Sequence, residues 1–176
     1  MKWMSRRKVI GLIGGMLGLV FLVPGASAGS HKEHPYRYSI LDMPVSLAAG
    51  TIRTPEFSVG GNWYWILIQV EKPLPFMQME CMMGVLPGPL DTKDCSSNDP
   101  LLRADWTVWD EGHLVFSGSS TTQADAQNTK KYIFKFLGSF GGEAGKKYAI
   151  EVKFTKDGTP LNVANPHLIV VKQGEE

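Results

Sequence analysis

Tyr148-Ala-Ile-Glu-Val-Lys-Phe154 decides the fold class, because large apolar residues recur in it at every second position. This period places them on one face of a strand, with Glu151 and Lys153 on the other face. Comparable stretches occupy 62–71, 105–109, 113–118 and 167–172, separated by turn-forming residues. Seven or so short strands in about 140 residues indicate an all-β protein in which two antiparallel sheets pack as a sandwich.

The segment that leads into this strand resembles a signature of immunoglobulin-like and fibronectin-like domains. In Gly145-Lys-Lys-Tyr148 a glycine turn precedes a tyrosine, which in those domains closes a corner between the sheets. Together with Leu137-Gly-Ser-Phe140 and Asn165-Pro-His-Leu168, it is similar to an uncharacterised family of exported bacterial β-sandwich proteins. The resemblance covers roughly the last 45 residues. It implies an immunoglobulin-like sandwich and export, and it brings no known activity.

The first 28 residues are typical of a cleavable signal peptide. A basic stretch that ends at Lys8 precedes a mostly apolar run from Val9 to Val23, and Ala26-Ser-Ala28 supplies the small residues of a cleavage site. As a helix the run would span about 22 Å, which is less than the roughly 30 Å of a bilayer core. We therefore expect a signal helix rather than a membrane anchor. The pair Arg6-Arg7 leaves the twin-arginine export route open.

The predicted organisation is a signal peptide over 1–28, a flexible mature N-terminus over 29–35 and a β-sandwich domain over 36–173. The full chain carries a net charge of +1. Cleavage would remove four basic and no acidic residues, leaving 14 basic against 17 acidic residues, a net charge of −3. This balance argues against a nucleic-acid partner and against general attraction to anionic membranes. We expect a periplasmic or extracellular protein with no stable membrane anchor after cleavage.

Two further stretches of the domain are assigned from their periodicity. Phe76–Met83 places three methionines and Cys81 at alternate positions, which predicts a strand with sulfur-bearing side chains on one face. Lys130–Phe140 fits both a helical stripe and a strand. The glycines that follow it favour the strand.

Cys81 and Cys95 are the cysteines of the chain. In an oxidising compartment an even pair is most simply a disulfide. A cysteine nucleophile is the alternative, but neither cysteine lies in a stretch that contains a histidine. The sequence also contains no nucleophile elbow, phosphate-binding glycine loop or H-E-x-x-H motif, so we expect no enzymatic activity.

Two features suit copper, although no cofactor is the first expectation. Cleavage after Ala28 would create the terminus Gly29-Ser30-His31, whose amine, amides and imidazole can form a square-planar nitrogen site for Cu(II). Met77 and Met79, close to Cys81 in the sequence, are soft ligands that suit Cu(I). The simpler interpretations are a frayed terminus and methionines that fill the core.

Trp63, Trp65 and Trp109 form the candidate contact surface. An exposed tryptophan pair would mark contact with a protein or a carbohydrate. The simpler interpretation is that Trp63 and Trp65 fill the core. The sequence thus predicts a non-enzymatic binding or interaction module for an unknown protein or small ligand. A periplasmic copper-binding protein is the alternative, and an immunity or inhibitor protein against an exported toxin or hydrolase is a further one.

Overall fold

The computed structural model describes residues 39–72, 76–84, 100–120 and 126–174. Within these ranges the chain forms strands, one α-helix and one 3-10 helix. In chain order they are β1 (Ser39–Pro44), β2 (Gly50–Arg53), β3 (Phe57–Ser58), β4 (Asn62–Glu71), α1 (Phe76–Met83), β5 (Ala104–Asp110), β6 (His113–Ser119), β7 (Ala126–Asn128), β8 (Tyr132–Gly142), β9 (Lys147–Phe154), η1 (Thr159–Ala164) and β10 (His167–Lys172).

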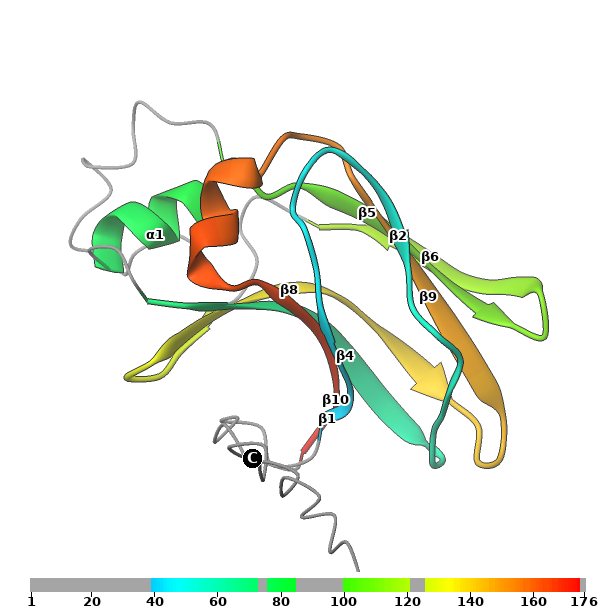
Figure 1. Ribbon diagram of the computed structural model, residues 1–176. Helices are drawn as coiled ribbons and strands as arrows, with labels where there is room; N and C mark the ends of the chain where they lie inside the picture. The colour runs from blue at the N-terminus through cyan, green and yellow to red at the C-terminus, as the bar shows by residue number, and fades with distance from the viewer. Residues whose placement is uncertain (1–38, 73–75, 85–99, 121–125, 175–176) are drawn as a thin grey trace, which may run out of the picture. The chain divides into compact units, whose positions relative to one another are not determined.

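The strands form two antiparallel sheets that pack face to face (Figure 1). Sheet A has the strand order β1-β10-β4-β8-β7. Sheet B has the order β2-β9-β5-β6, and β3 also pairs with β9. The predicted all-β, two-sheet sandwich is therefore confirmed. The predicted signal helix lies outside the described residues.

Apolar side chains at alternate strand positions form the core between the sheets. On β9, the buried core residues are Tyr148, Ile150, Val152 and Phe154, as the period of two predicts. The ambiguous stretch over Lys130–Phe140 falls largely within β8, so the strand interpretation is confirmed.

The predicted strand over Phe76–Met83 is wrong, because this segment is the helix α1. Methionine, glutamine and glutamate are good helix formers. Met79 and Met83 are four positions apart, lie on one face of the helix and are both fully buried in the core. In Figure 1, α1 and the orange-red helix η1 are both drawn at the same end of the sandwich, which we call the helix end.

The other end, which we call the turn end, carries the turns at 59–61, 111–112 and 143–146 (Figure 1). At the last of these, the Tyr148 hydroxyl accepts a hydrogen bond from the Glu143 backbone N–H at 3.1 Å. Since Glu143 follows a strand of sheet A and Tyr148 lies on a strand of sheet B, this bond closes a corner between the sheets. The corner predicted for Tyr148 is therefore present.

Trp106 joins the two sheets inside the core. It is buried on β5, and its indole Nε1 donates a hydrogen bond to the Leu137 carbonyl of β8 at 2.8 Å. The β4–β8 pairing skips Leu137, and such a bulge takes a residue out of the regular ladder, which leaves this carbonyl available to the indole. The ring lies against Gly118 and Gly138, and an added Cβ at Gly138 would come within 2.2 Å of it.

Lys135 is a fully buried lysine at the helix end. Its Nζ donates hydrogen bonds to the carbonyls of Met83 at 2.6 Å and Gly84 at 3.3 Å. Both carbonyls lie at the C-terminal end of α1, where a helix leaves its last carbonyls without internal partners. Burial, and then the positive charge of Arg103, lower the pKa of Lys135 to about 8. Through these hydrogen bonds, Lys135 of β8 connects the C-terminal end of α1 to sheet A.

Candidate functional site

Strand β4 turns its tryptophans away from the core. Tyr64 lies in the core, stacked on Phe140 with ring centroids 5.5 Å apart. Because side chains alternate along a strand, Trp63 and Trp65 lie on the outer face of sheet A. Trp63 and Trp65 therefore do not fill the core between the sheets, as the simpler interpretation had it, and Tyr64 takes that place.

The outer face of sheet A has an apolar cluster of its own. Trp65 and Phe136 are partly buried and pack against it. Their rings meet edge to face with centroids 6.4 Å apart, a favourable geometry for aromatic pairs. The buried members of the cluster are Leu67, Tyr132, Phe134, Ile169 and Val171. Trp65 is thus held in place by side chains of its own sheet.

Trp63 extends this aromatic face toward the turn end. Its exposed fraction is 56%, and it is the only aromatic residue among the exposed large hydrophobic side chains of the described part of the chain. Its neighbour on β8 is Gly141, which offers no side chain to cover the indole. The Trp63 carbonyl accepts a hydrogen bond from the Gln173 backbone N–H at 2.9 Å. Trp63 therefore combines a hydrogen-bonded backbone with an indole that is exposed to solvent.

Trp109 lies on the opposite outer face, that of sheet B. Since Val108 points into the core, Trp109 points outward from β5. The Arg53 guanidinium lies 5.5 Å from its ring centroid, within the range of a cation–π contact. Its Nε1 donates a hydrogen bond to Thr107 Oγ1 at 3.0 Å. The structure therefore separates Trp109 from the tryptophans of β4, and the predicted three-tryptophan surface reduces to Trp63 and Trp65.

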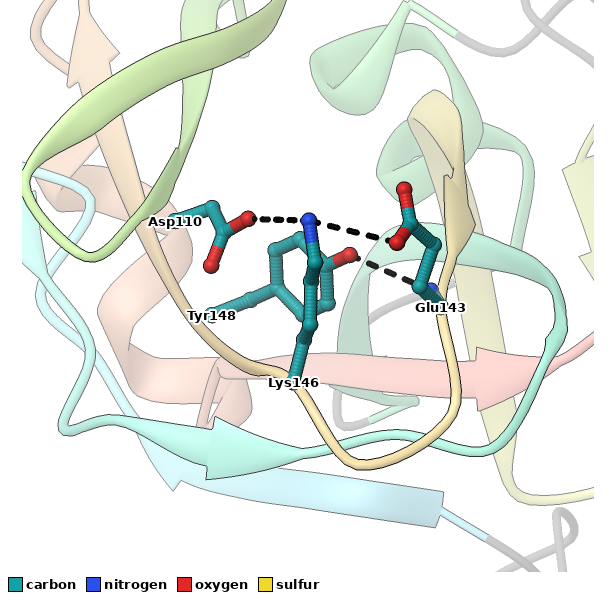
Figure 2. Close-up of polar contacts among 4 residues, drawn as sticks. All are labelled: Asp110, Glu143, Lys146 and Tyr148. Atoms are coloured by element: carbon teal, nitrogen blue, oxygen red, sulfur yellow. Dashed lines mark hydrogen bonds and ion pairs between the residues drawn. The ribbon is translucent and has the colours of Figure 1, made fainter.

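An ion-pair cluster links two turns at the turn end (Figure 2). Lys146 Nζ lies 2.9 Å from Asp110 Oδ2 and 3.2 Å from Glu143 Oε2. The hydrogen bonds to Asp110 and then Glu143 raise the pKa of Lys146 well above its usual range. The amine therefore stays protonated and is not a nucleophile. No local motif in the sequence indicates this cluster, since Lys146 and Asp110 lie 36 positions apart.

Most of the predicted copper ligands lie outside the part of the chain whose side chains the structure describes. Gly29, Ser30 and His31 lie outside them. Met79 is fully buried in the core, and Met77 is described only as part of the α1 backbone. In the described ranges, no group of three or more His, Cys, Asp or Glu side chains could hold a metal ion. Copper binding stays a prediction.

The predicted disulfide also stays a prediction. Cys81 is buried in α1, and Cys95 lies outside the described residues. As for membrane insertion, the described ranges contain no helix that is long and apolar enough to cross a bilayer.

Comparison with known proteins supports the fold. A scan against protein-family models and a search of curated proteins both find no match. Among solved structures, the chain is similar to the crystal structure of GEBA250068378 from Sulfurospirillum deleyianum, at 9% sequence identity and a TM-score of 0.56. The alignment covers 76% of this chain and 97% of that chain. At this identity the likeness extends to the fold alone, so the two proteins share a two-sheet sandwich.

Proposed function

We propose that the protein is an exported binding module whose contact surface is the outer face of sheet A around Trp63. The exposed indole of Trp63 is the observation that carries the proposal. Tryptophan offers a large apolar surface and a polar N–H, and it is enriched among the residues that dominate binding energy. We expect the partner to be a protein or a small ligand with an apolar or sugar-like face.

The surroundings of Trp63 support this role, because they form a surface that is ordered in advance. Trp63 pairs with Gly141 on one side, and Gln173 fixes its carbonyl. The adjacent Trp65 is held by its edge-to-face contact with Phe136. A surface that is already ordered loses little side-chain entropy when it binds.

Trp63→Ala should weaken binding of the partner by about 2 kcal/mol or more, since tryptophan is enriched among the interface residues whose truncation costs most binding energy. The test compares which proteins or glycans immobilised wild type and variant retain from the exported fraction of the cells that make the protein. The matched control is Val163→Ala, which truncates another exposed apolar side chain, 70% exposed on η1. A component retained equally by wild type and Trp63→Ala would contradict this contact surface.

Export, signal cleavage and a Cys81–Cys95 disulfide are part of the proposal. The protein recovered from its native compartment should begin at Gly29, and its mass should rise by two hydrogens on reduction. Intact-mass spectrometry before and after reduction measures both properties. A chain that still begins at Met1 would contradict cleavage, and a mass unchanged by reduction would contradict the disulfide.

A further inference from the structure

The outer face of sheet A surrounds Trp63 with small or uncharged residues. Gly141 of β8 pairs with Trp63, and Ser139 pairs with Trp65. On the other side, the register of β10 and β4, continued by one residue, brings Gln173 opposite Trp63, where the Gln173 backbone N–H donates to the Trp63 carbonyl at 2.9 Å. Residues that lie opposite each other on antiparallel strands point to the same side of the sheet. The indole therefore stands between a glycine and an amide, and a hydroxyl lies one row away.

The polar groups beside the indole can bind a ligand. Gln173 is exposed and Ser139 is half-buried. Within the described ranges, neither side chain takes part in a hydrogen bond. Position 141 carries no side chain, and an added Cβ there would lie 3.9 Å from two ring atoms of Trp63. A ligand in contact with the indole would therefore meet a donor and an acceptor on one side and no bulky side chain on the other.

The exposed apolar surface around Trp63 matches a small ligand better than a protein. The indole is 56% exposed and offers on the order of 100 Å², whereas a stable protein interface buries about 800 Å² on each partner. The apolar cluster beside it adds little, because Leu67, Phe134 and Val171 are at most 4% exposed. Among the residues of sheet A whose burial is described, Ile40 on the edge strand β1 is the one other exposed large hydrophobic side chain. The surface is thus comparable in size to a single sugar ring.

We propose that Trp63 binds a pyranose ring of a neutral glycan, whose hydroxyls hydrogen-bond to Gln173 and Ser139. This inference rests on the proposed function and names the partner of the same surface. One side of a pyranose presents C–H groups with partial positive charge, which suit the electron-rich face of an indole. The amide and the hydroxyl supply the neutral donors and acceptors that sugar hydroxyls need. Since Gly141, Ser139 and Gln173 are uncharged, a charged ligand gains no ion pair from them.

Isothermal titration calorimetry of the exported protein tests the proposal. The probes are neutral hexasaccharides of β-1,4-linked glucose, xylose, mannose and N-acetylglucosamine. We expect at least one of them to bind, with a dissociation constant on the order of 0.1–1 mM for a contact of this size. Trp63→Ala should raise that constant by about tenfold or more. Trp109→Ala removes the indole on the outer face of sheet B, so this matched control should leave binding unchanged. Circular dichroism checks that both variants are folded.

Gln173→Ala tests the hydrogen-bonding side of the site. The variant keeps the backbone hydrogen bond to Trp63 and removes the amide, so the dissociation constant should rise by about threefold or more. The proposal would be overturned if no hexasaccharide bound at concentrations up to about 10 mM, or if heparin, a polyanion, bound more tightly than every neutral glycan. Binding that either Trp63→Ala or Gln173→Ala left unchanged would also overturn it.

The failure of this inference is distinct from the failure of the proposed function. If the wild type retained a protein that Trp63→Ala lost, and no glycan bound, the contact surface would stand and the glycan would not. If Trp63→Ala retained every component that the wild type retains, the contact surface itself would be wrong.

Discussion

Gly138→Ala should lower the free energy of unfolding by about 3 kcal/mol or more, because the new methyl group has no space in the core. An added Cβ at this position would lie 2.2 Å from a ring atom of Trp106. The ring is confined on another side by Gly118, where an added Cβ would lie at 2.6 Å. Its indole is also fixed by the hydrogen bond to the Leu137 carbonyl. The Trp106 ring or the backbone at Gly138 must therefore move from its packed position.

Urea unfolding, followed by tryptophan fluorescence, measures this effect. Gly141→Ala is the matched control on the same strand, since its added Cβ would lie 3.9 Å from the nearest atoms, an ordinary contact. We expect the control to change the free energy of unfolding by less than about 1 kcal/mol. If the two variants were equally stable, the described packing of Trp106 between the sheets would be incorrect.

Lys135 should make the protein more stable as the pH rises through the window from 8 to 10.5. The pKa of Lys135 is about 8 in the folded protein, against an ordinary value of 10.5. Within this window the unfolded chain still binds a proton that the folded chain has released, so stability increases with pH. The neutral amine keeps two N–H groups, which are enough for the carbonyls of Met83 and Gly84.

Comparison with Lys135→Met and Lys135→Arg separates the pH dependence contributed by Lys135 from that of the other titrating groups. Methionine does not titrate, and arginine stays charged throughout the window. Relative to either variant, the free energy of unfolding of the wild type should increase by about 2 kcal/mol between about pH 7.5 and about pH 10. Urea unfolding at both pH values supplies the comparison. If the free energy of unfolding changed with pH in the same way for the wild type and both variants, Lys135 would not be a buried amine that titrates in this window.

The sandwich could be predicted from the sequence because strands such as β9 bury every second side chain. The helix α1 could not be predicted in this way. Its two fully buried methionines, Met79 and Met83, are four positions apart, and this spacing places two residues on one face of a helix and also on one face of a strand. In a short segment, the apolar pattern alone does not separate the two.

The candidate site was predicted only in part, because β4 is apolar at nearly every position. One feature of the sequence does indicate which face of β4 points into the core. The odd-numbered positions end in the polar Gln69 and Glu71. The even-numbered positions from the tyrosine onward are wholly apolar: Tyr64, Ile66, Ile68 and Val70. Because Trp63 and Trp65 share the face that ends in polar residues, this difference indicates that they lie on the outer face of the sheet. The bulge at Leu137 in the β4–β8 pairing and the ion pairs of Lys146 depend on distant parts of the chain, so no local pattern reveals them.

The place of β10 in sheet A has a consequence for when the protein folds. The last described strand along the chain lies between β1 and β4, and His167 Nδ1 meets Asp42 Oδ1 at 2.5 Å across 125 positions. Until β10 has been synthesised, β1 lacks the strand it pairs with and β4 lacks one of its two neighbours. Contacts between such distant segments also slow folding. Sheet A of a nascent chain therefore cannot close until synthesis has passed Lys172.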